Sequence, residues 1–282
     1  MKAPKRVLLS LFLWALAAAL TVAPAAAEER RYTLSVVPQF PAVEIHRSWS
    51  PVAERLQRET GLRLELKTHA GIPAFEEDFL QGRSDFAYMN PYHAVMARRA
   101  QGYVPLVRDG SRQLAGILLV RQDSPYKSVK DLDGSELAFP APNAFGASLY
   151  MRALLSEEER IRFRPNYVST HTNVMRHVLL GQAAAGGAVG ATFAKEPPEV
   201  RGLLRVLYET PGVEPHPLAA HPRVPAKDRE AVVAALLQLG QDAAAAPMLQ
   251  AIQMPRPVRA DYGRDYRPLE RLKLEKYVQP PE

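Results

Sequence analysis

Apolar and polar positions along the chain switch between a period of two and a helical period, which predicts strands alternating with helices. Residues 32–37 are typical of a strand, and residues 50–60 of an amphipathic helix with Ser50 as its cap and Pro51 in its first turn. The alternation continues through strands at 62–67, 86–89 and 104–107 and helices at 73–81 and 92–99. Strands separated by such helices predict a mainly parallel sheet with right-handed crossovers.

A second cycle begins with residues 114–120, LAGILLV, a continuous apolar run typical of a strand buried on both faces. Further strands are predicted at 136–139, 164–168, 185–189 and 203–208, and helices at 146–155, 172–180 and 227–239. We therefore expect an α/β protein with two similar lobes. Residues 114–121 and 206–220 are the predicted crossings between them.

Three segments place a polar residue at the point where a strand leads into a helix. Asn90 precedes Pro91, Asn143 follows the strand at 136–139, and Thr170 precedes His171. Such residues cap helices, and the free backbone amides of a helix N-terminus also bind oxyanions. Plain capping is the alternative for each segment alone, whereas three such segments in one chain indicate the rims of a ligand cleft.

Aromatic side chains at the ends of strands are candidates for the walls of that cleft, because Tyr and Trp combine apolar surface with a hydrogen-bond donor. Phe40, in the first strand–helix loop, is the better aromatic candidate. Tyr88 and Tyr92 flank Asn90, and core packing is the alternative for Tyr88.

The first 27 residues have the three parts of a secretory signal peptide: Lys2, Lys5 and Arg6, then an apolar run, then Ala25-Ala26-Ala27. Cleavage after Ala27 would remove three cations and lower the formal charge from +6 to +3. This modest charge gives no argument for nucleic-acid binding. No later apolar run approaches a membrane span, so we expect a periplasmic protein that is not membrane-integral.

Signatures of enzymes, metals and cofactors are missing from the sequence. There is no cysteine, and no nucleophile-elbow, P-loop or H-E-x-x-H pattern. The run Gly186-Gly187-Ala188-Val189-Gly190 does not match a dinucleotide fingerprint, and His171 and His177 do not share one face of a helix. We expect a binding protein without a cofactor or a metal, and not an enzyme.

Five segments together resemble a known family: LSVVPQF, SPVAERLQRETGLRLEL, LQGRSDFAYMNPYHAVMA, GSELAFPAPNAFGASLYMRALL and STHTNVMRHVLLGQAAAGGAV. In this order they are similar to the phosphate/phosphite/phosphonate substrate-binding proteins of ABC transporters. The resemblance implies a type II periplasmic-binding fold, with residues 28–117 and 218–282 in one lobe and 118–217 in the other. It also implies a small anionic ligand and an ABC permease as partner. A ligand-sensing partner of a membrane histidine kinase is the alternative, and an enzyme on this scaffold is a third.

The resemblance also bears on single residues. Tyr88, Asn90 and Tyr92 fall where the family contacts its ligand, and His171 matches a family histidine. The family's Ser/Thr run is replaced here by Asn143-Ala144-Phe145, and a family acid by Ala184. A charged His171 would donate to an oxyanion in an acidic periplasm. The complete set of predicted ligand-binding residues is Phe40, Tyr88, Asn90, Tyr92, Asn143, Thr170 and His171.

Overall fold

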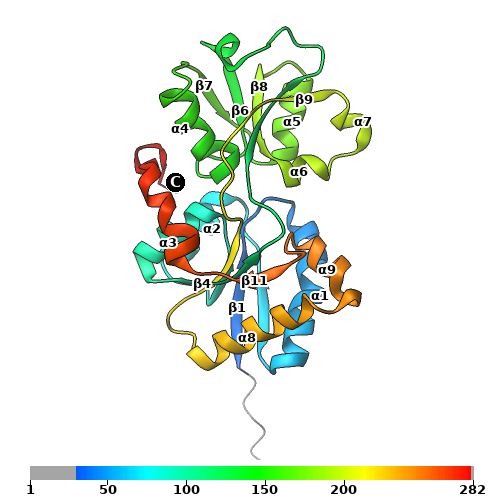
Figure 1. Ribbon diagram of the computed structural model, residues 1–282, viewed down its shortest axis with the longest axis vertical. Coiled ribbons are helices and arrows are strands. Elements are labelled where there is room, and N and C mark those ends of the chain that lie inside the picture. Colours follow the sequence, from blue (N-terminus) through cyan, green and yellow to red (C-terminus); the bar gives the residue numbers. More distant parts are fainter. Residues whose placement is uncertain (1–29, 281–282) are drawn as a thin grey trace, which may run out of the picture.

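Two mixed β-sheets, each covered by helices, form the two lobes of the computed structural model, which describes residues 30–280 (Figure 1). The first sheet has the strand order β11-β4-β10-β3-β1-β2 and the second β7-β6-β8-β5-β9. In the first lobe, α1, α8 and α9 pack together on one side, and α2 and α3 on the other. The expected two-lobed α/β architecture is confirmed.

The bounds of the elements follow the chain from one lobe to the other and back. The first lobe contains β1 Arg31–Val36, α1 Ala42–Thr60, β2 Arg63–Lys67, α2 Ile72–Leu80, β3 Phe86–Tyr88, α3 Pro91–Gln101, β4 Val104–Asp109, β10 Pro217–Ala220, α8 Ala226–Leu239, α9 Ala246–Ala251 and β11 Pro257–Arg259. The second contains β5 Gly116–Arg121, β6 Glu136–Phe139, α4 Tyr150–Glu157, β7 Arg164–Tyr167, α5 His171–Leu179, β8 Ala185–Val189, α6 Gly190–Ala194, α7 Pro198–Arg201 and β9 Leu204–Glu209. Short 3₁₀ and π turns complete the chain at Val129–Leu132, Phe145–Leu149, Ala243–Ala245, Tyr262–Tyr266, Arg267–Leu272 and Leu274–Tyr277.

The expectation of a mainly parallel sheet is wrong, because strands that follow a crossing run against their neighbours. β1 pairs in parallel with β2 and β3, but β10 lies antiparallel between β3 and β4. In the second lobe β5 is antiparallel to both β8 and β9. A chain that returns from the other lobe enters the sheet from the opposite end, and the local periodicity carries no information about this.

Helix α1 begins at Ala42, eight residues before the predicted start, and Ser50 and Pro51 lie inside it. A proline within a helix removes one hydrogen bond and costs about 3 kcal/mol. The apolar face continues across this position and offsets the cost by burial. The buried residues of that face are Ile45, Trp49, Val52, Ala53 and Leu56.

The glycines of β8 and β5 let other backbones approach the second sheet. A Cβ on Gly187 would lie 1.9 Å from the Ala147 carbonyl oxygen, and one on Gly116 would lie 1.9 Å from that of Gly146. A Cβ on Gly186 would instead meet Val174 of α5 at 2.4 Å. The glycine run therefore serves close packing of the π turn Phe145–Leu149 and of α5 against the sheet.

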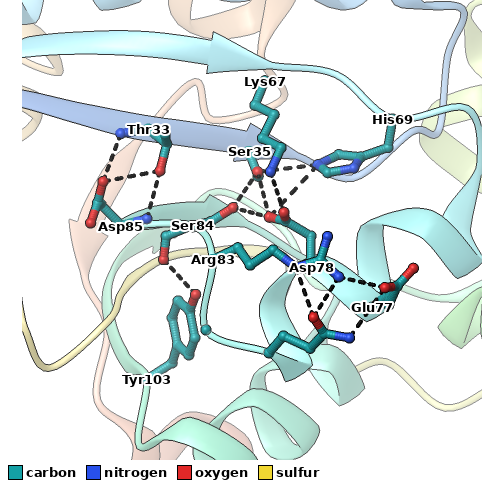
Figure 2. A network of polar contacts seen from close by, with 12 residues as sticks. Thr33, Ser35, Lys67, His69, Glu77, Asp78, Arg83, Ser84, Asp85 and Tyr103 are labelled. Carbon is teal, nitrogen blue, oxygen red and sulfur yellow. Dashed lines mark hydrogen bonds and ion pairs between the residues drawn. The ribbon is translucent and has the colours of Figure 1, made fainter.

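The residues before Asn90 build the scaffold of the first lobe (Figure 2). Asp85 accepts hydrogen bonds from the backbone N–H of Thr33 at 2.9 Å and from its hydroxyl at 3.0 Å. Ser84 and Ser35 both donate to the buried Asp78 carboxylate, which also pairs with Lys67. This network joins β1, β2, α2 and the loop before β3, so it holds β3 in place beneath the cleft.

Two crossings connect the lobes, and they pair with each other. The chain passes from β4 to β5 through residues 110–115 and returns from β9 to β10 through residues 210–216. Between them the N–H of Leu114 donates to the Val213 carbonyl at 2.8 Å, and that of Val213 donates to the Leu114 carbonyl at 2.9 Å. Paired crossings of this kind form a hinge.

Candidate functional site

A small cavity lies between the lobes, at the carboxyl edge of both sheets and next to the hinge. It has a volume of about 20 Å³, room for about one water molecule. We call it the central cavity. Its walls are Val37, Gln39, Ile72 and Asn90 of the first lobe, Ala144–Ala147, His171 and Val189 of the second, and Leu114 and His216 of the crossings. None of these described wall residues is Lys, Arg, Asp or Glu.

An aromatic stack lies next to the central cavity on the first-lobe side and reaches it through one member, His216. Tyr88 ends β3, where Val36 and Leu218 are its neighbours in the sheet, and its ring packs on Trp49 and His216 with centroids 4.8 and 5.5 Å apart. Burial raises the pKa of Tyr88 and lowers the pKa of His216 to about 3. Both side chains are therefore neutral at ordinary pH.

His171 is the first residue of α5 and faces the cavity from the second lobe. It is 5% exposed, and burial lowers its pKa to about 4. The Thr192 hydroxyl donates to the Val189 carbonyl at 2.8 Å and lies 3.3 Å from Nδ1 of His171. The hydroxyl proton is thus committed, so we assign the His171 proton to Nδ1, which leaves Nε2 as an acceptor. The expectation of a charged His171 in an acidic periplasm is wrong, because desolvation keeps the ring neutral.

On one side of the cavity the lobes are joined by polar contacts between three buried residues, Glu76, Asn90 and Asn143, and the exposed Gln279. We call these four residues the clasp. The Asn143 side-chain amide donates to Glu76 of α2 at 3.0 Å and to the Gln279 carbonyl at 2.6 Å, and its oxygen accepts from the Gln279 N–H at 3.0 Å. The Asn90 amide donates to the Asn143 carbonyl at 3.1 Å. Glu76, Asn90 and Asn143 are each at most 3% exposed.

The C-terminal segment contributes to this clasp after packing along both lobes (Figure 1). In the first lobe Glu275 pairs with Arg99 of α3 at 2.6 Å. In the second, Arg152 of α4 donates to the Tyr277 carbonyl at 2.8 Å, and the Tyr277 hydroxyl donates to Glu157 at 2.8 Å. Residues 274–280 thus form a third connection between the lobes, in addition to the two crossings.

The opposite side of the cavity is more open. Here Lys195, just after α6, lies 4.0 Å above the ring of Phe40 and 3.3 Å from Glu44 of α1. These residues, with Arg47 and Glu196 among others, surround a wider cavity of about 480 Å³ that we call the outer cavity. His171 lines both this cavity and the central one. The two cavities therefore lie side by side at His171.

The chain matches the family described as ABC transporter, phosphonate, periplasmic substrate-binding protein over residues 34–266. It belongs to that family. The import role of the family is favoured over the sensor alternative. The signal peptide predicted for residues 1–27 lies outside the described residues, and residues 267–280 lie beyond the family match.

Solved structures of related proteins agree with the fold of this family member. PhnD1 of Prochlorococcus marinus, in complex with methylphosphonate, has a TM-score of 0.78 at 14% identity, over 89% of this chain and all of that one. A binding component of an ABC phosphonate transporter from Pseudomonas aeruginosa has a TM-score of 0.77 at 14% identity, over 87% and 86% of the two chains. A Xanthomonas citri protein bound to ATP has a TM-score of 0.71 at 18% identity, over 88% and 99%.

The structure of this substrate-binding protein gives the predicted site residues different positions. Asn90 and His171 line the central cavity, Tyr88 packs on the wall residue His216 without lining the cavity itself, and Phe40 lines the outer cavity. Thr170 caps α5 by accepting from the Asn173 N–H at 3.1 Å, and the Tyr92 ring stacks on Phe145 with centroids 6.3 Å apart. Asn143 contacts Glu76 and Gln279, and no side chain caps the π turn that follows it. Whether these seven residues bind ligand stays a prediction.

The sequence interpretation did not single out the crossing residues Leu114 and His216, or Gln39 and Val189, all of which line the central cavity. His216 lies in a Pro-rich segment within the predicted crossing 206–220. A histidine inside a predicted crossing was the one available signal for its place at the cleft.

Among residues 30–280, no group of three or more His, Asp or Glu side chains has the arrangement of a metal site. No single helix among these residues is long and apolar enough to span a membrane. Helix α8 and the segment Ala243–Ala251 together have the length and composition of a span, but the chain bends by 95° between them.

Proposed function

We propose that this protein captures a small ligand with a phosphonate-like oxyanion in the cleft between its lobes and delivers it to an ABC permease. The observation that carries the proposal is a cavity whose walls come from both lobes and from both crossings. Such a site changes its volume when the hinge moves, which couples ligand binding to closure. Family membership supplies the class of ligand, and the methylphosphonate complex of the Prochlorococcus relative supplies the first compound to test.

The ligand would displace part of the closed arrangement, because the central cavity has room for only about one water molecule. Phe145, which is 2% exposed, fills space on the second-lobe wall. We infer that ligand access requires separation of the lobes or a shift of this ring. The wider outer cavity offers the path.

His171 is the residue for which the chemistry is most specific. As a neutral acceptor at Nε2 it favours a ligand oxygen that carries a proton, such as the P–OH of a phosphonate monoanion. A charged ligand in a cavity without charged walls depends on neutral donors, including backbone N–H groups. Binding by this means selects the protonated form of the ligand over the full dianion.

The test is isothermal titration of the purified protein with methylphosphonate, phosphite and phosphate. We expect binding of at least one of them, and at least a tenfold loss of affinity in His171→Ala. His46→Ala is the matched control, because His46 is an exposed histidine of α1. Absence of binding by all three compounds would overturn the oxyanion proposal and leave the fold and family unchanged.

We also propose that the protein acts by binding alone and catalyses no reaction. The family is one of substrate-binding transport proteins. The test is recovery of bound methylphosphonate after prolonged incubation, followed by phosphorus NMR. Chemical conversion of the ligand that depends on the protein would overturn this proposal.

A further inference from the structure

An aromatic contact joins the two lobes beside the central cavity, and Phe145 forms its second-lobe side. The Phe145 ring packs against Tyr92 of α3, in the first lobe, with centroids 6.3 Å apart and an angle of 7° between the planes. It also packs against Tyr150 of α4, in its own lobe, at 5.6 Å and 13°. All three side chains are buried. These nearly parallel rings therefore form a buried stack that crosses from one lobe to the other.

The apolar core of the first lobe continues across this contact. One connected cluster of buried side chains contains Leu34 of β1 and Phe86 of β3 together with Phe145 and Val189 of the second lobe. Other core residues of the second lobe form separate clusters. The lobes thus share apolar surface that water would otherwise cover, and its burial stabilises the closed arrangement through contacts of the protein alone.

Phe145 also fills space that a ligand would need. It lines the central cavity, whereas Tyr92 and Tyr150 do not. The cavity that remains has a volume of about 20 Å³, so a phosphonate group fits only if a wall residue moves. Phe145 has the largest side chain among the wall residues of this cavity. Its ring is therefore the largest obstacle to a ligand.

The stretch of wall around Phe145 can rearrange at this ring and hardly elsewhere. The other members, Ala144, Gly146 and Ala147, have a methyl group or no side chain. Their backbone is fixed, because the carbonyls of Gly146 and Ala147 lie against glycines of the second sheet. Phe145 begins a π turn that no side chain caps, and π turns are frequent at functional sites. The Phe145 ring is thus the part of this wall that can make room.

We propose that Phe145 is an internal plug, which occupies the ligand position between the closed lobes and determines which ligands bind. A ligand enters the central cavity by displacing the ring from Tyr92. The preferred ligand replaces the lost contact with a flat apolar group of its own, attached to the oxyanion. This inference rests on the proposed function, because it assumes that the oxyanion enters the central cavity.

Displacement of the plug lowers the affinity of the natural protein for every ligand. Only the fraction of molecules in which the ring has moved can bind, and the measured dissociation constant rises in inverse proportion to that fraction. A compact oxyanion such as methylphosphonate offers little apolar surface in place of the ring. A phosphonate with an aromatic substituent restores the contact with Tyr92, so it offsets the loss better.

The test is isothermal titration of the natural protein and of Phe145→Ala with methylphosphonate and phenylphosphonate. We expect Phe145→Ala to bind each compound at least tenfold more tightly than the natural protein does, because no ring has to be displaced. In both proteins phenylphosphonate should bind at least tenfold more tightly than methylphosphonate, since its ring fills the space beside Tyr92. Phe145→Leu keeps a smaller apolar side chain and should give smaller gains. If Phe145→Ala does not fold, the same comparison with Phe145→Leu decides.

The matched control is Phe163→Ala, which loses the same atoms elsewhere in the second lobe. Phe163 is partly buried, packs on Phe139 with centroids 6.1 Å apart, and is not a wall residue of the central cavity. We expect this substitution to change both affinities less than twofold. Gains equal to those of Phe145→Ala would overturn the plug, because a general loosening of the second lobe would then account for them.

The outcomes separate this inference from the proposed function. If the natural protein binds and Phe145→Ala binds within twofold of it or more weakly, the plug is overturned and the oxyanion function is intact. The same holds if phenylphosphonate binds no more tightly than methylphosphonate to Phe145→Ala. Binding by Phe145→Ala and not by the natural protein supports the plug and overturns the oxyanion function of the natural protein. Binding by none of these proteins overturns both.

Discussion

The two lobes meet on both sides of the central cavity, and the two contacts differ in burial and in chemistry. On the clasp side, Asn143 makes three hydrogen bonds to Glu76 and Gln279, and the side chains of Asn143 and Glu76 are buried while Gln279 is exposed. On the outer side, Lys195 contacts Phe40 and Glu44 with about a third of its side chain exposed. A buried polar network is costly to break, whereas an exposed ion pair is screened by water and salt. We expect the clasp side to hold the closed form and the outer side to open first.

Removing the Asn143 side chain is the change expected to have the largest effect. In Asn143→Ala the buried Glu76 carboxylate loses a donor and the Gln279 backbone loses both partners, so we expect a loss of about 3 kcal/mol in the free energy of unfolding. Urea unfolding measures this loss. Small-angle scattering should also show a larger radius of gyration, because the lobes separate.

The control for this change is Asn166→Ala. Asn166 of β7 donates to Glu136 at 2.8 Å within the second lobe, so its loss affects stability without affecting the contact between lobes. An unchanged radius of gyration in Asn143→Ala, or the same increase in Asn166→Ala, would contradict the assignment of the clasp.

Protonation of His171 reports how well water is excluded from the central cavity, which lies between the clasp side and the outer side. The pKa of His171 is about 4 in the folded protein and near 6.5 in the unfolded chain. Above pH 6.5 both states are neutral and the free energy of unfolding is at its full value. As the pH falls from 6.5 towards 4, the unfolded chain gains a proton and the folded protein does not, so stability is lost. Between pH 7.5 and 4.5 this loss is about 2 kcal/mol from His171 alone.

Urea unfolding of the natural protein and of His171→Gln at pH 7.5, 5.5 and 4.5 isolates this contribution, because the other titrating groups are common to both. We expect the loss of stability on acidification to be about 2 kcal/mol smaller in His171→Gln. His46→Gln, at an exposed position, should retain the loss seen in the natural protein. Equal pH dependence in all three proteins would mean that water reaches His171 from the outer side.

Local chemistry accounts for the parts of the fold that could be predicted. Asn90 caps α3 by accepting from the His93 N–H at 2.7 Å, and Thr170 caps α5, both as the sequence indicates. A cap depends on residues three positions away, so a short window contains all the necessary information. The strands at 86–89 and 185–189 were predictable for the same reason, since their apolar runs and flanking turns are local features.

The contacts of the cleft could not be predicted, because their partners are distant in the sequence. Asn143 lies 67 residues from Glu76 and 136 from Gln279, and no local pattern joins them. The start of α1 was also missed: capping rules favoured Ser50-Pro51, but burial of Trp49 and Ile45 extends the helix past the proline. In both cases tertiary burial decided the outcome, and a sequence pattern describes only the local preference.

Shortening the C-terminus tests whether the third connection holds the clasp. Deletion of residues 279–282 removes the two backbone partners of Asn143 and leaves its bond to Glu76. We expect a smaller loss than in Asn143→Ala, about 1 kcal/mol in the free energy of unfolding, with a partial increase in the radius of gyration. Deletion of residues 281–282 alone is the control and should change neither quantity. A loss equal to that of Asn143→Ala would shift the main role from Glu76 to the C-terminal segment.

The smallest effect is expected on the outer side. Lys195→Ala removes an exposed ion pair and a cation–π contact, each of which contributes roughly 0.5 kcal/mol or less when solvated. A double-mutant cycle of Lys195→Ala with Glu44→Ala, measured by urea unfolding at 0.05 and 0.5 M NaCl, should give a coupling free energy below about 0.5 kcal/mol that disappears at the higher salt concentration. If the coupling exceeds 1 kcal/mol and persists in salt, the outer side is as firmly closed as the clasp side. The lobes would then have no preferred side on which to open, and ligand access would need both contacts to break together.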